Sequence, residues 1–347
     1  MRHRVLVTAV GGNVGQGVAK ALRAASRPYT VFGGDMEPRS AGFWLVDRPL
    51  VFPPASSPEL KPALIDTIRQ HGIEAVFVCS PAELAFYMRE RQAIEDGTGA
   101  KVLLNPDKVI RVGQDKLATA RFLEAHGFPT PETCLADDAE AVDGLVGRWG
   151  FPVIGKPRRG ASSVNVFRLE SRAALDAART LVPELIVQRL LPDATAELTV
   201  GVVGSALAGS FAWIALRRDL LQGTTYRTEL NQDPAVGALV TALGTALGVE
   251  GACNFQLRLV DGQPFVFEIN PRFSGTCGIR YLYGFNDPDM AFAQACLGAP
   301  VTQPALRPGV VMRYWNEVHV PDAAFGTVIR GGAPAAGQPM TLPPPKP

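Results

Sequence analysis

The stretch that decides the fold is Phe267-Glu-Ile-Asn-Pro-Arg-Phe-Ser-Gly275. It follows a strand-like run at residues 254–260 and the dipeptide Asp261-Gly262. Two alternating apolar runs joined by Asp-Gly predict a β-hairpin. Because side chains alternate between the two faces of a strand, Glu268 and Asn270 are expected to share one face.

Three polar side chains on this hairpin form a candidate metal site: Gln256, Glu268 and Asn270. They supply three oxygen donors and one negative charge. Mg²⁺ prefers hard oxygen ligands, few carboxylates, and phosphates from the substrate to complete its shell. Arg272 follows two residues after Asn270, where a guanidinium can contact a transferring phosphoryl group. We therefore expect the three polar residues to bind a metal and Arg272 to act in catalysis.

This pattern of Gln followed by Glu-x-Asn-Pro-Arg resembles the metal-binding strands of the ATP-grasp superfamily. The similarity is greatest to the carbamoyl-phosphate-synthase-like branch, which accepts Gln at the first ligand position. The resemblance implies ATP and Mg²⁺ as cofactors, with Mn²⁺ as an alternative metal. It also implies that a small-molecule carboxylate is activated as an acyl phosphate, which an amine then captures. The implied enzyme is an ADP-forming carboxylate–amine ligase.

The composition describes an ordinary globular protein. The 347 residues exceed one typical core, so two or three domains are expected. With 19% charged residues and a net charge of +1, nothing favours nucleic acid or a membrane surface as a partner. The chain moves directly from Met1 into a strand, and its five cysteines lack metal or disulfide spacing. We therefore expect a cytoplasmic protein with small-molecule substrates, and a homodimer is left open.

Lysine is scarce, and its few positions are informative. Arginines outnumber lysines 27 to 7, and between Lys108 and Lys346 only Lys116 and Lys156 occur. A residue type that is avoided elsewhere marks the positions where it is needed. Lys116 and Lys156 are therefore functional candidates.

The first hundred residues alternate between strand and helix patterns. Strands are expected at residues 4–10, 29–35, 75–79 and 101–104, and helices at 13–25, 58–71 and 82–95. Such alternation predicts an open parallel sheet covered by helices. Asn105-Pro106 breaks the pattern, so we expect a Rossmann-like domain at residues 1–105.

A glycine-rich turn from Gly11 to Gly17 raises an alternative function. Glycines between a strand and a helix expose a helix N-terminus that attracts phosphate, as in dinucleotide-binding folds. Asp35 ends the second strand at the position of a ribose-binding acid. An NAD(P)-dependent oxidoreductase is therefore a competing interpretation, although the spacing departs from G-x-G-x-x-G. In the ATP-grasp interpretation the turn is structural, and Gly12 and Asn13 line the substrate cleft.

Residues 106–190 are predicted to form a lid subdomain. Helices are expected at 115–125, 137–149 and 171–181, and strands at 152–157, 164–169 and 185–191. The small-residue loop between two of these strands can close over phosphates with backbone N–H groups and serine hydroxyls, which makes Ser162 and Ser163 candidates for ATP binding. The resemblance implies that Lys156, on the strand before this loop, and Lys116 contact the nucleotide phosphates.

Further nucleotide contacts follow from the resemblance. The backbone that recognises adenine corresponds here to Gln188, Arg189 and Leu190. Glu197 opens the next strand and matches the acid that lies near the ribose. The chain departs from the family at Gln188, where Glu is more usual, and at residues 192–195, which form a longer insert.

Residues 191–330 carry the metal hairpin and are expected to form the C-terminal ATP-grasp lobe. Residues 216–227 are polar and lie between strand-like runs, and Arg217 and Arg227 are candidates to bind a substrate carboxylate. Helices are also expected at 233–247 and 288–297, and a strand at 309–315. Residues 331–347 are rich in Ala, Pro and Gly and are expected to be a disordered tail.

The combined prediction is an α/β and α+β protein with a Rossmann-like domain followed by a two-lobed ATP-grasp domain. Five motifs in the family's order favour the ligase over two alternatives. A carboxylate or carbamate kinase would need no amine, and the oxidoreductase would leave the metal hairpin unexplained. In the ligase, Lys116 would stabilise phosphoryl oxygens together with Lys156 and Arg272, the two residues expected to be catalytic. Cys277 has no paired histidine and is expected to be a packed side chain.

Overall fold

The computed structural model describes residues 2–160, 165–192 and 197–329. The chain divides into two compact units, and each is described by itself. Unit 1 comprises residues 1–105, 250–252 and 272–347, and unit 2 comprises residues 106–249 and 253–271. The chain therefore returns to unit 1 twice after leaving it. The expected lid and lobe boundaries at 190 and 330 stay predictions, and the expected tail lies outside the described residues.

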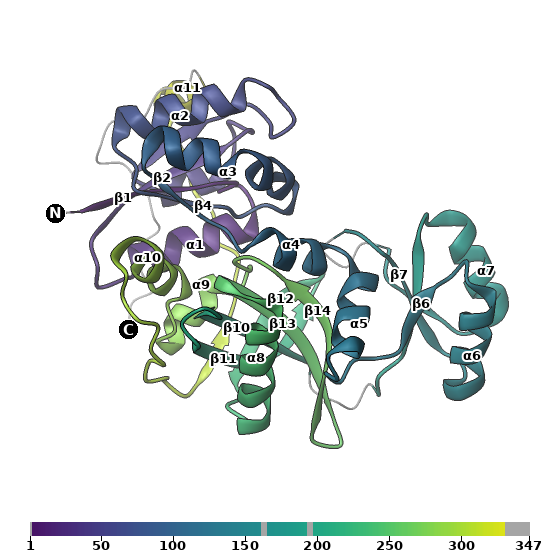
Figure 1. Ribbon diagram of the computed structural model, residues 1–347. Helices are drawn as coiled ribbons and strands as arrows, with labels where there is room; N and C mark the ends of the chain where they lie inside the picture. The colour runs from purple at the N-terminus through teal and green to yellow at the C-terminus, as the bar shows by residue number, and fades with distance from the viewer. Residues whose placement is uncertain (1, 161–164, 193–196, 330–347) are drawn as a thin grey trace. The chain divides into compact units, whose positions relative to one another are not determined.

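Unit 1 is built on a parallel sheet with strand order β3-β2-β1-β4-β5 (Figure 1). Its strands are β1 (His3–Val7), β2 (Tyr29–Asp35), β3 (Arg48–Val51), β4 (Ala75–Phe77) and β5 (Lys101–Leu103), and β15 (Val310–Met312) also belongs to this unit. Its helices are α1 (Asn13–Arg23), α2 (Leu60–His71), α3 (Leu84–Thr98), α9 (Cys277–Arg280), α10 (Asp287–Leu297) and α11 (Asp322–Ile329), with short 3-10 turns η1 (Ala41–Leu45), η2 (Pro81–Glu83) and η3 (Tyr281–Tyr283). Helices α2 and α3 lie on one face of the sheet, and α1 and α10 lie on the other (Figure 1).

Glycine allows the first helix of unit 1 to pack closely. A Cβ on Gly15 would lie 2.4 Å from the carbonyl oxygen of Ala9, so no larger residue fits where α1 follows β1. A Cβ on Gly17 would lie 3.0 Å from the backbone nitrogen of Gly278, which brings α9 against α1. The four strands expected in this region are present, and β3 is one that the sequence patterns did not indicate.

Asn105 fixes the point at which the chain leaves unit 1 and first returns. Its Nδ2 donates to the carbonyl oxygen of Ala252 at 2.7 Å, and its Oδ1 accepts from the N–H of Glu250 at 3.0 Å. The Asn105 side chain is buried, so both hydrogen bonds are shielded from water. The returning segment 250–252 is thereby fastened beside the departing one.

The first part of unit 2 holds an antiparallel sheet with strand order β6-β9-β7-β8. Its elements are α4 (Asp107–Gln114), α5 (Lys116–Ala125), β6 (Thr133–Leu135), α6 (Ala139–Trp149), β7 (Val153–Pro157), β8 (Phe167–Leu169), α7 (Arg172–Leu181) and β9 (Leu185–Arg189). Asp138 and Ser171 begin α6 and α7 by accepting hydrogen bonds from the first turns of these helices. Both helices pack on this sheet around a core that includes Val142 and Leu175.

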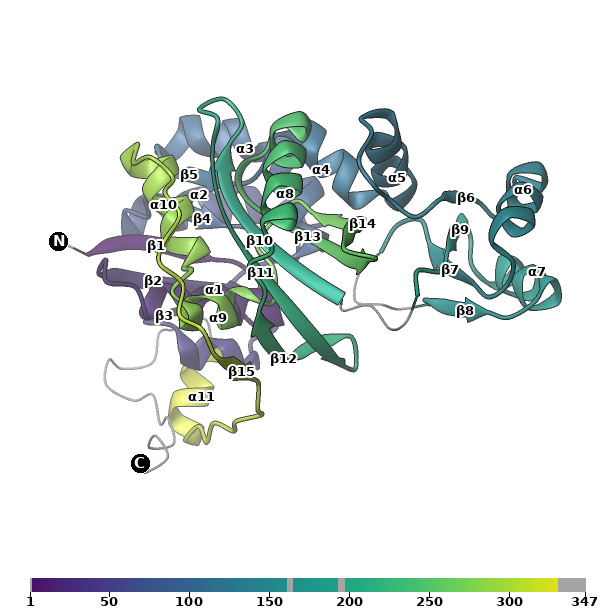
Figure 2. The same ribbon diagram turned by 90° about the horizontal axis from the view of Figure 1, so that it is seen from below.

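The second part of unit 2 is a larger antiparallel sheet with strand order β14-β13-β10-β11-β12 (Figure 2). Its strands are β10 (Glu197–Ser205), β11 (Ser210–Leu221), β12 (Thr224–Leu230), β13 (Glu250–Val260) and β14 (Gln263–Asn270), and α8 (Pro234–Leu247) covers one face. Val240 and Leu243 of α8 are buried with Phe255 in the core between the helix and the sheet. The other face is thereby left for the site.

The predicted β13–β14 hairpin is present, but its register is irregular. Its turn residues Asp261 and Gly262 have φ of 49° and 79°, as a tight hairpin turn requires. Gln256 lies opposite Glu268, whereas the next residue, Leu257, lies opposite Val266. Phe267 is therefore the extra residue of a β-bulge.

The expectation that residues 216–227 separate two strands is wrong. These residues form most of a second hairpin, β11–β12, which turns at Gln222 and Gly223 with φ of 49° and 73°. Most of their polar side chains lie on the exposed face of a β-ladder, which shifts register between Asp219 and Leu220, whereas Arg218 points into the interior. Helix α4 was likewise not expected.

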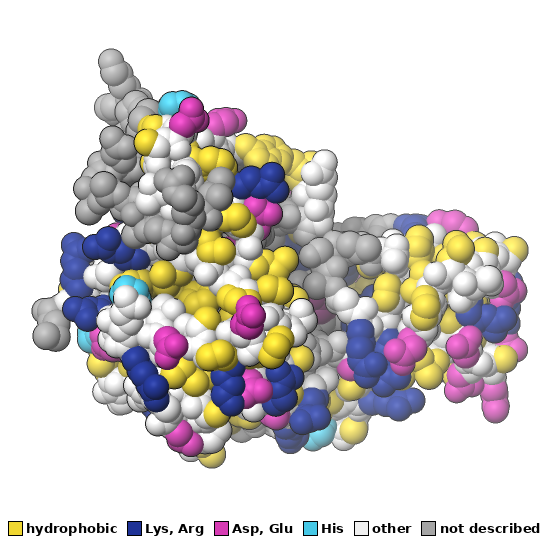
Figure 3. All heavy atoms as spheres, turned by 90° about the horizontal axis from the view of Figure 1, so that it is seen from above, with side chains coloured by type: hydrophobic (Ala, Val, Ile, Leu, Met, Phe, Trp, Pro, Cys, Tyr) yellow, Lys and Arg dark blue, Asp and Glu magenta, His cyan; other side chains and the backbone are white. Residues whose placement is uncertain are grey.

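Within the described part of the chain, no helix is both long enough and apolar enough to cross a membrane. On the lobe formed by α6 and α7, Figure 3 shows acidic and basic side chains interspersed. Ion pairs in this lobe include Arg168 with Glu170 at 2.9 Å and Arg179 with Asp137 at 3.9 Å.

Candidate functional site

A cleft between the two sheets of unit 2 gathers most of the predicted nucleotide residues. Its volume is about 200 Å³, and it is open to solvent. Its lining includes Lys116, Lys156, Gln188, Arg189, Leu190, Glu197, Gln256 and Glu268.

Positive charge dominates the polar lining of this cleft. Its basic side chains are Lys116, Lys156, Arg159, Arg189, Arg218 and Arg258, whereas Glu197 and Glu268 are its acidic ones. Clefts lined mainly by one sign of charge concentrate ligands of the opposite sign. The cleft is therefore suited to a polyanion.

Apart from Gln188 and Gln256, the remaining side chains of the lining are apolar and can accept a flat ring. It includes Ile154, Val166, Leu190, Leu191, Leu220 and Phe267. At one edge the guanidinium of Arg189 stacks 3.5 Å from the centroid of the Trp149 ring. Trp149 Nε1 in turn donates to Glu132 at 2.8 Å, which fixes the stack.

Lys156 of β7 is a buried cation, and among the described residues its hydrogen-bond acceptor is an amide oxygen instead of a carboxylate. Its Nζ donates to Gln188 Oε1 at 2.9 Å, and Gln188 Nε2 donates to Thr133 at 2.8 Å. Burial lowers the pKa of Lys156 to about 8, although the negative charge of Glu268 partly opposes this shift. A ligand phosphate would give this ammonium an anionic partner.

Lys116 begins α5 and faces the same cleft. Its Nζ donates to the carbonyl oxygen of Gly160 at 2.9 Å, so the residue also contacts the described start of the glycine loop. Burial lowers the pKa of Lys116, and the charges of Glu268 and Asp115 oppose that effect. The predicted loop residues Ser162 and Ser163 lie outside the described residues.

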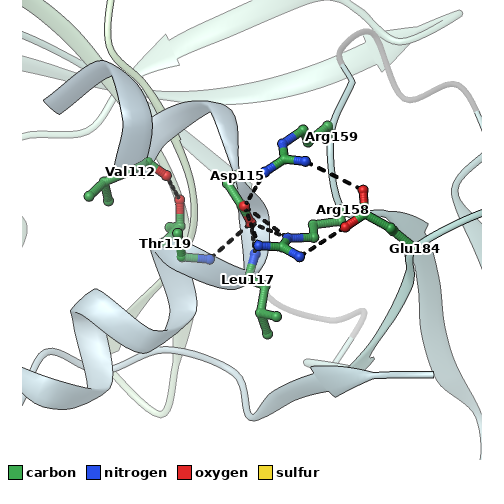
Figure 4. Close-up of polar contacts among 8 residues, drawn as sticks. Val112, Asp115, Leu117, Thr119, Arg158, Arg159 and Glu184 are labelled. Atoms are coloured by element: carbon green, nitrogen blue, oxygen red, sulfur yellow. Dashed lines mark hydrogen bonds and ion pairs between the residues drawn. The ribbon is translucent and has the colours of Figure 1, made fainter. Parts of the chain in front are cut away.

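Asp115 connects α5 to the loop that follows β7, as Figure 4 shows. Its Oδ1 accepts from the backbone N–H groups of Leu117 and Ala118, both at 3.1 Å, which caps the helix. Its carboxylate also pairs with Arg158 at 2.8 Å and with Arg159 at 3.1 Å. Burial alone would raise the pKa of Asp115, but these guanidinium groups and the cap lower it.

Glu184 completes this network from the other side. It pairs with Arg158 at 2.9 Å and with Arg159 at 3.4 Å (Figure 4). The two consecutive arginines are therefore held between two acids, and Lys116 is fixed next to them.

The three predicted metal ligands on the β13–β14 hairpin have different hydrogen-bond partners. Asn270 Nδ2 donates to Glu268 Oε1 at 2.9 Å, which orients both side chains. Gln256 Oε1 instead accepts from Arg218 Nη2 at 3.0 Å. Glu268 and Asn270 therefore suit a hard cation such as Mg²⁺, which takes one or two carboxylates and completes its shell with water and phosphate. Gln256 is already engaged by a positive charge.

The bulge at Phe267 helps to form the site. Strict alternation would place Phe267 and Glu268 on opposite faces, but both line the cleft. The ring of Phe267 lies 5.8 Å from Lys156 Nζ, within reach of a cation–π contact. Bulges commonly re-aim side chains beside active sites.

Residues 181–318, which include this hairpin, match a family model described as ATP-grasp in the biosynthetic pathway with Ter operon. The chain contains an ATP-grasp domain. The resemblance inferred from Glu268 to Arg272 is thereby confirmed, and so is the two-part α/β and α+β fold class.

Known proteins similar to this chain include ATP-grasp ligases. A D-alanine–D-alanine ligase of Cupriavidus taiwanensis is 28% identical over 193 residues, which cover 50% of this chain and 57% of that protein. A carbamoyl phosphate synthase large chain of Paenarthrobacter aurescens is 22% identical over 98% of this chain and 32% of its own length. The chain thus spans little more than half of the first curated relatives that it matches.

A solved structure supports the fold over most of the chain. The ADP complex of the N5-carboxyaminoimidazole ribonucleotide synthetase PurK has a TM-score of 0.69 to this chain at 17% identity. The superposition covers 89% of this chain and 80% of that one. At this identity the likeness concerns the fold.

None of the three predicted arginines is among the residues that line the cleft. Arg217 and Arg227 belong to unit 2, and Arg272 belongs to unit 1. Arg217 and Arg227 on the β11–β12 hairpin are half exposed and pair with acids, Arg217 with Glu229 at 3.4 Å and Arg227 with Asp219 at 2.6 Å. Arg272 belongs to unit 1, and its Nη1 donates to the carbonyl oxygen of Phe273 at 2.8 Å. Their roles toward a substrate stay predictions.

Gly12 and Asn13 lie at the start of α1 in unit 1, and their role as substrate residues also stays a prediction. Asp35 Oδ2 accepts from the N–H of Gly11 at 2.7 Å, and Oδ1 accepts from the N–H of Glu37 at 3.0 Å. Both carboxylate oxygens therefore stabilise the turns around the glycine-rich segment. These hydrogen bonds explain the presence of an acid at position 35 without a bound dinucleotide.

Two arginines that line the cleft were not predicted from the sequence. Arg218 was passed over for Arg217, and Arg258 was not considered. Simple alternation would have identified Arg258, because it lies two residues after Gln256 on the same strand. Cys277, expected to be packed, is buried, and its Sγ donates to Asp287 at 3.0 Å.

Proposed function

We propose that this protein is an ADP-forming ligase that activates a small-molecule carboxylate with ATP and joins it to an amine. The observation that carries the proposal is one cleft that combines Lys116 and Lys156 with Glu268, and Glu268 lies in the stretch that matches the ATP-grasp model. Such a cleft provides positive charge for a triphosphate, an apolar slot for a base, and a carboxylate for a metal ion. The ligase activity of the D-alanine–D-alanine ligase relative agrees with this chemistry.

The roles of the residues follow from their positions. The apolar slot with the backbone of Gln188, Arg189 and Leu190 would hold the adenine, and Glu197 would lie near the ribose. Lys116 and Lys156 would bind phosphate oxygens and stabilise the negative charge that develops on them during transfer.

Glu268 and Asn270 would hold Mg²⁺, which when bound offsets phosphate charge, and Mn²⁺ is the alternative metal. Arg272 would contact the transferring group, and Arg217, Arg227, Gly12 and Asn13 would contact the acceptor substrates. Ser162 and Ser163 would add hydroxyl contacts to the phosphates.

The overall reaction balances without an acid–base residue of special pKa. An oxygen of the substrate carboxylate attacks the γ-phosphorus, the bond from this phosphorus to the β–γ bridging oxygen breaks, and ADP leaves. The amine nitrogen then attacks the acyl carbon, inorganic phosphate leaves, and the nitrogen loses a proton. We further propose that the protein acts in the cytoplasm.

The deciding experiment incubates the protein with MgATP and pools of carboxylates, with and without pools of amines, and identifies products by mass spectrometry. The ligase predicts ADP and a new amide only when both pools are present. ADP formation with carboxylates alone, with the acyl phosphate trapped by hydroxylamine, would indicate the kinase instead. Absence of nucleotide consumption in every pool, with ATP shown not to bind, would refute the ATP-dependent function.

A further inference from the structure

The side chain of Arg218 on β11 is held in one orientation by three partners. It is nearly buried, with 10% of its side chain exposed. Its Nε and Nη2 donate to Glu197 Oε1 at 2.9 and 2.5 Å, and its Nη1 donates to Thr225 Oγ1 at 3.3 Å. Nη2 also donates to Gln256 Oε1 at 3.0 Å. The guanidinium therefore has little freedom to move away from Gln256.

The chemistry of the two groups fixes the orientation of the Gln256 amide. A guanidinium only donates hydrogen bonds, so the amide must turn its oxygen toward Arg218 and its NH₂ group away. An amide has one oxygen, whereas a carboxylate at the same position would have two. A metal ion on Gln256 would thus have to share this single oxygen with a positive charge, which is unfavourable.

Two guanidinium groups lie beside Gln256 and contact the same carboxylate. Glu197 accepts from Arg218 through Oε1 and from Arg258 Nη2 through Oε2 at 3.5 Å, so two guanidinium groups share one carboxylate. Across the hairpin, the amide of Asn270 donates a hydrogen bond, whereas the amide of Gln256 accepts one. Asn270 donates its NH₂ to Glu268, which turns the amide oxygen of Asn270 away from that bond and leaves the second oxygen of Glu268 for a cation.

We propose that Gln256 is the hydrogen-bond acceptor that positions Arg218 and not a metal ligand, so that this ATP-grasp domain holds a single divalent cation, on Glu268 and Asn270. Arg218 supplies fixed positive charge on the other side of the site, where a carboxylate at 256 would favour a second ion. This inference rests on nucleotide binding as proposed above, and it replaces the expectation that Gln256 coordinates the metal.

The test counts Mn²⁺ ions bound to the protein–ADP complex by electron paramagnetic resonance, which measures free Mn²⁺ without turnover. The wild-type protein–ADP complex is expected to bind one Mn²⁺ ion. The Gln256→Ala complex is expected to bind one Mn²⁺ ion with an unchanged Kd. Glu268→Gln is expected to raise the Kd by at least about tenfold. A second Mn²⁺ in wild type, or a loss in Gln256→Ala as large as that in Glu268→Gln, would overturn the inference.

A double variant tests the other half of the argument. Arg218→Met with Gln256→Glu removes the guanidinium and supplies a second carboxylate opposite Glu268, so a second Mn²⁺ is expected to bind. Arg111→Met, which removes an exposed arginine of α4 outside the cleft, is the matched control and should leave the count at one. A count of one in the double variant, with circular dichroism confirming its fold, would contradict the role given to Arg218.

ADP binding is measured first, without metal, in every protein. If wild type binds ADP but the metal count depends on Gln256, this inference fails while the proposed function stands. If wild type binds no ADP with or without Mn²⁺, both the proposed function and this inference are refuted.

Discussion

Because buried Lys156 donates to the neutral amide of Gln188, nucleotide affinity is predicted to depend on pH, and replacing Gln188 should shift that dependence. Gln188→Glu would place a carboxylate oxygen where the amide oxygen now lies, 2.9 Å from Lys156 Nζ. At an effective dielectric constant of about 20, opposite unit charges about 3 Å apart attract by roughly 5–6 kcal/mol. Because the new carboxylate must itself be buried, only part of this energy remains. We expect the pKa of Lys156 to rise from about 8 by about one to three pH units.

Nucleotide affinity reports this pKa. ADP phosphates favour the protonated lysine, and they are fully ionised above about pH 7.5. In wild type, metal-free ADP should therefore bind most tightly below pH 8 and weaken above it, by up to about tenfold per pH unit. In Gln188→Glu the decline should begin at a higher pH, whatever the absolute affinity. Isothermal titration calorimetry from pH 7 to pH 10 measures both profiles.

The control is Lys156→Arg, which keeps the positive charge throughout this range and should remove the decline. The reasoning is refuted if wild-type affinity is constant from pH 7.5 to pH 9.5. It is also refuted if Gln188→Glu declines at the same pH as wild type.

Three further predictions concern other parts of the molecule. Glu268→Gln should abolish MgATP turnover but leave metal-free ADP binding intact, and turnover close to wild type at saturating Mg²⁺ would contradict the metal role. Asp115→Ala removes the cap of α5 and its pairing with two arginines, so urea unfolding should show a loss of about 1–3 kcal/mol, whereas Asp115→Asn keeps an acceptor and should lose less. MgATP at about a hundredfold excess over its Kd should stabilise the protein by about 2.7 kcal/mol. NAD should give no thermal shift, and a shift with NAD that Asp35→Ala removes would favour the oxidoreductase.

Much of the fold could be predicted because its signals are local. Hydrophobic periodicity located most helices and strands, and Asp261-Gly262 fixed the hairpin that carries Glu268. The bulge at Phe267 could not be predicted, since nothing in a single strand shows how its partner pairs with it. Arg218 was missed for the same reason, because choosing between neighbouring arginines requires the register of β11 against its neighbours β10 and β12.

The network around Asp115 shows a second limit of sequence analysis. A cap at the start of α5 was foreseeable, but Arg158 lies 43 positions along the chain, at a distance that only the folded sheet defines. Short β3 and α4 were missed because a few residues give too little periodicity to measure.

The second return of the chain to unit 1, at residue 272, has a consequence for how the protein is made. The sheet strands of unit 1 are complete by Leu103, whereas α9 and α10, which pack on α1, begin only at Cys277 and Asp287. At roughly 5–20 residues per second, the ribosome needs roughly 9–35 s to add the approximately 170 residues between Leu103 and Cys277. During that interval α1 lacks the helices that pack against it, and the part of the sheet that α10 covers stays exposed, while most of unit 2 is synthesised. We therefore expect the folding nascent chain to bind chaperones that recognise exposed apolar surface, and slowing translation should prolong that binding.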